Sequence, residues 1–253
     1  MRAIAIVNQK GGSGKTTTAV NLSAALGERD RQVLLIDLDP QASASHWYGI
    51  KDSGPGLLDV FTANGNLVDL VYQTHTAGVD VVPASPWLVG ADKMLSGEPG
   101  AEAILRSAIQ QLPGSRWDYL IFDCPPALGI LTVNALAAAG EVLVPVEAHV
   151  MALSGLAQLL QTVDLIRERL NGELEITGIL ACRVDFRTRH AQDVVEQLRV
   201  RFGNLVYNVV IRENVRIAEC PSFGQPIMEY GPRSAGAADY RALAEEVLGQ
   251  ERS

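Results

Sequence analysis

The sequence predicts an α/β protein with a doubly wound, mostly parallel sheet and helices on both faces. Short apolar runs alternate with helix-length segments almost from end to end. The runs are rich in Val, Ile and Leu and mostly continuous, which is typical of strands buried on both faces of a parallel sheet. Strand–helix alternation of this kind implies right-handed crossovers. Because no Ser- or Pro-rich linker divides the chain, we expect residues 1–253 to form one domain.

The expected strands share this apolar character and are Ala3–Asn8, Gln32–Leu38, Val79–Pro83, Tyr119–Asp123, Val142–Val146, Ile176–Arg183 and Leu205–Ile211. The expected helices lie between or after them and are Thr16–Glu28, Ala101–Leu112, Leu128–Ala139, Leu153–Leu170, Ala191–Phe202 and Ala237–Leu248. We expect the last helix to pack back on the sheet.

Composition excludes several classes of protein. With 47% hydrophobic and 20% charged residues, the chain is not expected to be largely disordered. The longest weakly polar stretch, Ala135–Leu160, contains Glu141, Glu147 and His149 and makes a poor membrane span. The apolar run after Arg2 is too short for a signal peptide. Three widely spaced cysteines without a CxxC pair indicate buried free thiols in a reducing cytoplasm rather than a metal site.

The formal net charge of −8 argues against a positively charged coat. The charge is unevenly distributed, however: from Arg183 to Arg233 there are eight arginines and six acidic residues. This excess has two interpretations, a local basic face or a set of solvated helix faces.

The segment after the first expected strand carries the most specific motif, Lys10-Gly11-Gly12-Ser13-Gly14-Lys15-Thr16-Thr17. Glycines let backbone N–H groups surround phosphate oxygens, and the helix that follows presents its positive end to the same anion. Lys15 is expected to reach the β and γ phosphates, and the Thr16 hydroxyl to ligate Mg²⁺. We assign all eight residues to nucleotide binding, although Gln9 stands where the ordinary pattern has its first glycine. The alternative, a plain glycine turn, is disfavoured by GKT at a strand–helix junction.

Two acidic strand ends accompany this loop. The second expected strand runs into Asp37-Leu38-Asp39-Pro40-Gln41, and Tyr119–Asp123 is an apolar strand that ends in an acid. In an open α/β sheet such carboxylates face the ligand crevice. We expect Asp39 to position or activate the attacking water and Asp123 to hold Mg²⁺ through a water molecule. Asp37 is expected to be structural or bound to nearby backbone.

The second lysine of the loop, Lys10, makes the segment resemble the deviant Walker A box, KGGxGKT, of the ParA/MinD ATPases. The Asp39-Pro40-Gln41 and Cys124-Pro125-Pro126 boxes favour ParA over MinD and the nitrogenase iron protein. The resemblance covers nearly the whole chain and continues through Thr132-Val133-Asn134-Ala135, Val144-Pro145-Val146, Asn214-Val215-Arg216, Pro221-Ser222-Phe223-Gly224 and Tyr230–Ala238. A phosphate loop at residue 10 implies the short ParA form without an N-terminal DNA-reading domain.

The resemblance implies a Mg²⁺-dependent ATPase with Lys10, Lys15 and Asp39 as catalytic residues. Lys10 would reach the nucleotide of the opposite subunit in a homodimer that sandwiches two ATP molecules. The ATP state would bind double-stranded DNA without sequence preference, and a ParB-like partner would trigger hydrolysis. We expect a cytoplasmic, nucleoid-associated protein whose cargo, a chromosome, a plasmid or a protein assembly, stays open.

The arginine-rich region supplies the expected DNA contacts, namely Arg187, Arg189, Arg199, Arg201 and Arg216. Arg183 is assigned to nucleotide binding because it is placed to stack on adenine at a strand end. Where many ParA proteins read Ile-Pro-Arg-Asn, this chain has Ile211-Arg212-Glu213-Asn214, which leaves the base contacts open.

Two other functions are conceivable for a P-loop chain. A MinD-like membrane switch needs a basic amphipathic C-terminal helix, but Glu245, Glu246 and Glu251 outnumber the two arginines after Tyr240, so no membrane partner is expected. A metabolic P-loop ligase or kinase would show convergent polar groups beside the phosphate site, and the sequence identifies none.

Overall fold

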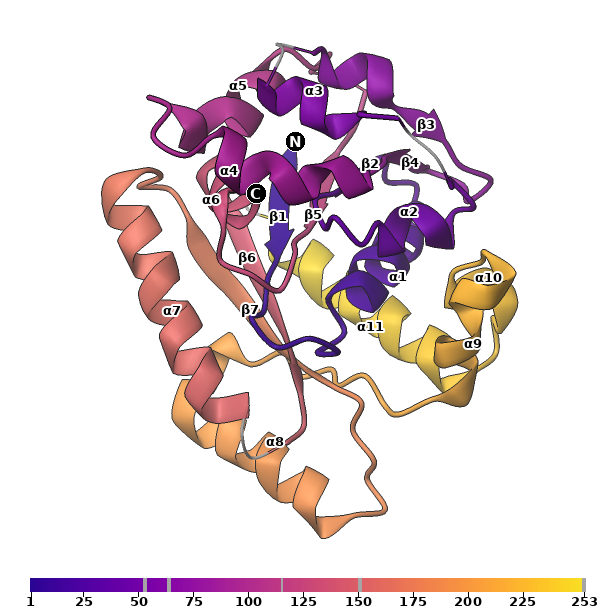
Figure 1. Ribbon diagram of the computed structural model, residues 1–253. Coiled ribbons are helices and arrows are strands. Elements are labelled where there is room, and N and C mark those ends of the chain that lie inside the picture. The colour runs from indigo at the N-terminus through magenta and orange to yellow at the C-terminus, as the bar shows by residue number, and fades with distance from the viewer. Residues whose placement is uncertain (52–53, 63–64, 115, 150–151, 252–253) are drawn as a thin grey trace.

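The computed structural model describes residues 1–51, 54–62, 65–114, 116–149 and 152–251. These residues form a seven-stranded sheet with the order β3-β4-β2-β5-β1-β6-β7 (Figure 1). Every neighbouring pair is parallel except β3–β4, which is antiparallel. The predicted fold class is therefore confirmed.

The strands of the sheet are β1 (Arg2–Ile6), β2 (Val33–Asp37), β3 (Tyr72–Gln73), β4 (Val79–Val82), β5 (Tyr119–Asp123), β6 (Glu141–Glu147) and β7 (Glu175–Cys182). The α-helices of the described residues are α1 (Lys15–Gly27), α2 (Ser43–Trp47), α3 (Leu57–Thr62), α4 (Ala91–Met94), α5 (Ile104–Gln110), α6 (Ile130–Ala138), α7 (Ala152–Arg169), α8 (Arg189–Phe202), α9 (Val215–Phe223), α10 (Ile227–Tyr230) and α11 (Ala235–Gly249). Short 3₁₀ turns occur at Leu67–Leu70, Pro86–Gly90, Ala101–Ala103 and Gly203–Leu205.

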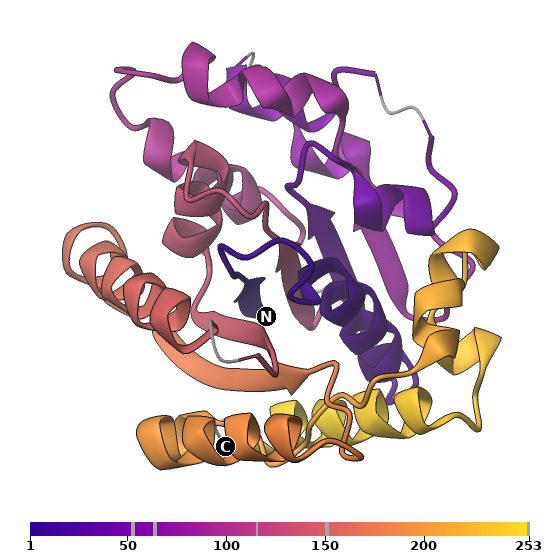
Figure 2. The same ribbon diagram turned by 60° about the horizontal axis from the view of Figure 1, so that its bottom comes forward.

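Helices cover both faces of the sheet, as Figure 2 shows. On one face, Ile4 and Ile6 of β1 belong to the apolar core that includes α1 and α11. On the other face, Ala5 belongs to the core under α5, α6 and α7. Successive residues of a strand point to opposite faces, so a strand buried on both sides must be apolar at every position. This explains the continuous apolar runs in the sequence.

One predicted strand, Leu205–Ile211, is not a regular strand. Its segment makes only isolated parallel bridges to the β7 edge, Ile179 with Val206 and Val184 with Arg212. Between them, the backbone N–H groups of Asn208 and Val209 donate to the Glu246 carboxylate of α11, at 3.0 and 2.7 Å. The N–H groups of Tyr207 and Ile211 do donate to the Ile179 and Ala181 carbonyls of β7, at 3.0 and 2.8 Å. The prediction of a regular strand was wrong because the Glu246 side chain interrupts this pairing between them.

The sequence also misplaced some helices. The expected helix Ala101–Leu112 is a 3₁₀ turn followed by α5, and the expected helix Leu128–Ala139 begins at Ile130. Helix α9 was missed, and it contains Pro221, a residue that normally argues against a helix interior. The three cysteines are buried and free, as predicted. None of the described helices is long and apolar enough to cross a membrane.

Candidate nucleotide site

The phosphate loop connects the carboxyl end of β1 to the N-terminus of α1. Gly12 and Gly14 have φ angles of 75° and 94°, a left-handed conformation that L side chains rarely adopt. Gly14 is the N-cap of α1 and brings no side-chain cap, so the first N–H groups of the helix are left for an anion. The loop therefore has the backbone geometry that a phosphate site requires.

Lys15 is the buried cation of this loop. Its side chain is 7% exposed, and its Nζ donates to the carbonyl oxygen of Lys10 at 3.3 Å. Burial lowers the pKa of Lys15, while the nearby carboxylates of Asp123 and Asp39 oppose that shift. A desolvated ammonium group in this position attracts phosphate more strongly than one in water.

Asp37 and Asp123 lie side by side at the carboxyl edge, where the register of β2 and β5 pairs them. Asp37 accepts hydrogen bonds from the N–H and hydroxyl groups of Ser45 at 2.8 and 2.7 Å and from the N–H of Asp39 at 3.1 Å. Burial raises its pKa to about 6. These bonds hold the start of α2 against the sheet, which confirms the expectation that Asp37 is structural.

Asp123 is the group that best fits a bound cation. It is fully buried, and within the described part of the chain neither carboxylate oxygen has a hydrogen-bond partner. Burial, reinforced by Asp37, raises the pKa of Asp123 well above its usual range. The Thr16 hydroxyl and the Lys15 charge both lower the pKa of this carboxyl group and so partly offset the effect of burial. A buried carboxylate beside a threonine hydroxyl is an oxygen set that suits Mg²⁺, so the residues present fit this ion.

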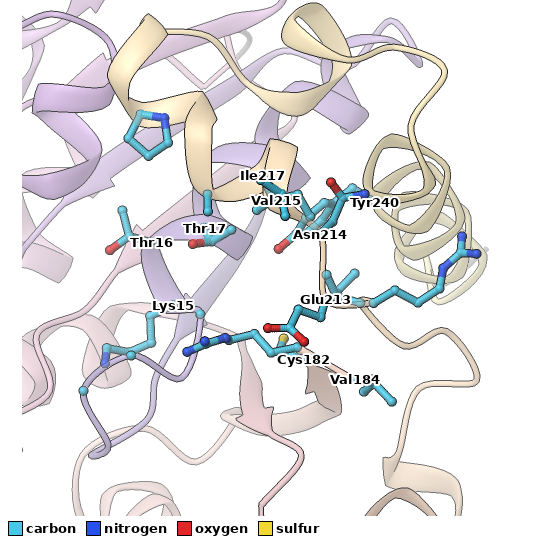
Figure 3. Close-up of a pocket in the computed structure, with 18 of the residues that line it drawn as sticks. Lys15, Thr16, Thr17, Cys182, Val184, Glu213, Asn214, Val215, Ile217 and Tyr240 are labelled. Carbon is cyan, nitrogen blue, oxygen red and sulfur yellow. The ribbon is translucent and has the colours of Figure 1, made fainter. Parts of the chain in front are cut away.

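A cavity of about 1140 Å³ opens over the loop and is shown in Figure 3. Lys15, Thr16 and Thr17 lie on one side of it in Figure 3, and Asp39 is also a lining residue. Across from them, the end of β7, the segment after Ile211 and α11 supply the opposite wall, where Glu213, Asn214 and Tyr240 are labelled in Figure 3. The volume is ample for a nucleotide, since small-molecule sites measure about 300–1,000 Å³.

The departure noted at Arg212-Glu213 has a structural consequence. The Arg212 guanidinium pairs with Asp239 of α11, with its NH2 group 2.6 Å from Oδ1. Glu213, which also lines the cavity, therefore brings a carboxylate to the wall while its basic neighbour is engaged with α11.

Three other residues predicted to bind the nucleotide, two from the phosphate loop and one from the end of β7, have different contacts in the structure. Arg183 lines the cavity and has a left-handed backbone, with φ 54°. Ser13 is buried, and its hydroxyl has no hydrogen-bond partner among the described residues. The Lys10 ammonium donates to Glu147 Oε2 at 2.6 Å, and Lys10 is not among the described residues that line the cavity.

The five arginines predicted to contact DNA are all exposed but lie in separate places. Arg187 pairs with Asp185 in the loop before α8 and lines the cavity. On α8, Arg189 is at the first turn, while Arg199 and Arg201 are at the last, about 200° apart around the axis. Arg199 donates to the Asn208 carbonyl at 3.1 Å, whereas Arg216 lies on α9. They do not share one helix face.

Sequence reasoning missed Glu147, Cys182 and Tyr240. Cys182 and Tyr240 line the cavity, and the Cys182 Sγ would lie 3.6 Å from a Cβ placed on Gly14. Only Glu147 had a signal in the sequence: it ends an apolar run at the carboxyl edge, as Asp123 does.

The fold and this site define the class of P-loop ATPases. Residues 1–176 match the protein family described as an AAA domain. The chain is 45% identical over 249 residues to the chromosome partitioning protein ParA of Myxococcus xanthus, covering 98% of this chain and 88% of the relative. It is 43% identical over 248 residues to the sporulation initiation inhibitor protein Soj of Bacillus subtilis, covering 97% and 98%. The chain belongs to the ParA/Soj family of partitioning ATPases.

A solved structure agrees with this assignment of fold. The crystal structure of cobyrinic acid a,c-diamide synthase from Mycobacterium smegmatis, with bound ADP and magnesium, matches with a TM-score of 0.87 and 33% identity. The match covers 100% of this chain and 97% of that one.

Proposed function

We propose that residues 1–253 form one Mg²⁺-dependent ATPase domain that dimerises around two ATP molecules and partitions or positions DNA. The observation that carries the nucleotide part is Lys15, which is buried, lines a cavity of about 1140 Å³ and interacts electrostatically with the buried, unpartnered carboxylate of Asp123 behind it. A buried cation and a buried carboxylate ready for a metal ion together suit a Mg²⁺-bound polyphosphate.

In this proposal each group has one role. Lys15 and the N–H groups at the start of α1 bind the β and γ phosphates, and Thr16 with Asp123 holds Mg²⁺. The ion, when bound, neutralises charge on the phosphate oxygens. Asp39 lines the cavity, its Oδ1 accepts from the Gln41 N–H at 2.9 Å, and we assign it to orienting the attacking water. Its backbone is fixed by the N–H bond to Asp37, which keeps the carboxylate at the cavity edge.

The partners follow from the family. ParA of Myxococcus xanthus is named a chromosome partitioning protein and Soj of Thermus thermophilus a chromosome-partitioning ATPase, which supports a role in moving DNA. We propose a ParB-like protein as the activator of hydrolysis. The exposed Arg187, Arg189, Arg199, Arg201 and Arg216 supply positive charge for DNA phosphates without base readout. We further propose that the protein is cytoplasmic and associates with the nucleoid in its ATP state.

The alternative is a MinD-like or other cargo-positioning ATPase that does not segregate DNA. The acids of the C-terminal region argue against a membrane cargo. Glu246 binds the backbone at Asn208 and Val209, and Glu251 pairs with Arg31, so both carboxylates belong to packing contacts on the protein. A helix end of this charge does not attract anionic lipid.

The experiment measures mass and DNA binding in the same samples. Light scattering with Mg²⁺-ATP should give a dimer and with Mg²⁺-ADP a monomer, and unrelated DNA duplexes should bind only to the dimer. A ParB-like protein encoded by a neighbouring gene should raise ATP turnover. If the dimer forms but binds no duplex at low salt, the result would favour the alternative, an ATPase that positions a cargo other than DNA.

A further inference from the structure

Glu147 contacts two of the cations around the phosphate site. It ends β6 at the carboxyl edge of the sheet, next to the loop that follows β1. Its Oε2 accepts from Lys10 Nζ at 2.6 Å, and its Oε1 lies 3.3 Å from Arg183 NH1. One carboxylate thus engages the second lysine of the loop and the arginine at the end of β7.

The backbone around Lys10 supports this contact. The Lys10 N–H donates to Asn8 Oδ1 at 2.9 Å, and Asn8 Nδ2 donates to the Pro145 carbonyl at 2.7 Å. Asn8 therefore ties the loop to β6 and places Lys10 beside Glu147. Lys10 is held there and is not among the described residues that line the cavity.

We propose that Glu147 is an internal competitor of the nucleotide phosphates, which withholds Lys10 and Arg183 until a polyphosphate displaces it. The inference rests on the proposed ATP binding. A carboxylate near the loop repels the phosphates and also occupies cations that would neutralise them. Glu147 is therefore a positioning residue that sets how strongly the site responds to the number of phosphates.

The expected size of the effect follows from exposure. The side chains of Glu147, Lys10 and Arg183 are 26%, 43% and 57% exposed, so solvent screens both ion pairs. The Lys10 hydrogen bond lowers the pKa of Glu147 and so favours its charged form. Partly exposed pairs are weak, so the competition corresponds to a change of about three- to tenfold in affinity. High salt is expected to reduce it.

The test compares Glu147→Gln with Glu141→Gln in the full chain. Glu141 is the matched control because it lies at the other end of β6, where it pairs with Arg2. Calorimetry at low salt should show Mg²⁺-ATP binding to Glu147→Gln about three- to tenfold more tightly than to the wild type. We expect a smaller gain for Mg²⁺-ADP, none for adenosine, and none for any ligand with Glu141→Gln.

A second comparison separates release of Lys10 from simple repulsion. In a Lys10→Gln background the gain from Glu147→Gln should shrink, because less cation is left to release; an undiminished gain would overturn the proposal. An equal gain for adenosine, or ATP binding of equal strength in wild type and Glu147→Gln, would also overturn it while the proposed function stands. No ATP binding by either protein would overturn the proposed function and this inference together.

Discussion

At the scale of the residue, three aspartates of the site show how surroundings set the role of one side chain. Asp37 is buried and accepts three hydrogen bonds from Ser45 and Asp39. Asp123 is buried without a partner among the described residues. Asp39 is partly exposed and lines the cavity. These environments suit a structural anchor, a cation ligand and a group that meets water, respectively.

Replacing Lys15 tests the phosphate site. Lys15→Ala removes the buried ammonium that offsets phosphate charge, and we expect ATP affinity to fall by a factor of about 100 or more. Calorimetry with Mg²⁺-ATP measures this, and circular dichroism checks the fold. Lys93→Ala, which removes an exposed lysine of α4, should leave affinity unchanged. Undiminished ATP binding by Lys15→Ala would contradict the assignment.

Asp39 is expected to act in hydrolysis and not in binding. Asp39→Ala should bind ATP and form the dimer, but its turnover should fall about 100-fold or more, since positioned acid–base groups contribute on that order. Phosphate release and light scattering measure the two properties. Asp69→Ala, at an exposed aspartate of the Leu67–Leu70 turn, is the control. Turnover of Asp39→Ala equal to the wild type would move this role to another residue.

At the scale of the element, the start of α6 depends on a side chain from α4. Asp92 Oδ1 accepts from the Ile130 N–H at 2.7 Å, so Asp92 caps α6 from a distant part of the chain. Gly129 is the N-cap residue, and a Cβ there would lie 2.7 Å from the same oxygen. The glycine leaves the space in which the carboxylate sits. This contact ties α4 to the helix that follows Asp123 and the Cys124-Pro125-Pro126 segment.

This cap predicts a coupled pair of mutations. Asp92→Ala and Gly129→Ala should each lower the free energy of unfolding by about 1 kcal/mol, because each removes the same cap. The double variant should cost little more than either single change. Urea unfolding measures all three, with Gly172→Ala as a control because nothing lies within 4 Å of its added Cβ. Additive losses would show that the two residues act separately.

At the scale of the whole molecule, charge is the property that bears on DNA. A chain of net charge −8 attracts DNA poorly over long range, and its exposed arginines are spread over α8, α9 and the loop before α8. A dimer has twice as many arginines, and once one subunit binds a duplex, the effective concentration of the other subunit at that duplex is raised. Binding is therefore expected to depend on assembly more than on any single helix face.

The corresponding prediction concerns Arg187 and Arg189. Replacing both with Gln should weaken binding of the ATP-bound dimer to every duplex alike and lower the slope of log affinity against log salt by about two units. A salt titration with two unrelated duplexes measures this. Arg167→Gln is the control, since Arg167 lies on α7 and pairs with Asp164. If the double variant had the same salt slope as the wild type, Arg187 and Arg189 would not be DNA contacts.

The sequence by itself determined the sheet, most of its strands and the phosphate loop, because these depend on neighbours in the chain. Continuous apolar runs identify buried strands, and the spacing from Lys10 to Thr17 identifies the loop.

Long-range contacts between polar side chains were decided only by the tertiary structure. Examples are the pairing of Lys10 with Glu147, 137 residues apart, and the capping of the Ile130 N–H by Asp92. The tertiary structure also decided that Glu246 accepts from the N–H groups of Asn208 and Val209. These contacts depend on strand order, which places β1 between β5 and β6, and on which helices pack together, such as α4 and α6 on one face of the sheet. No local pattern of residues encodes which distant side chain reaches a given polar group.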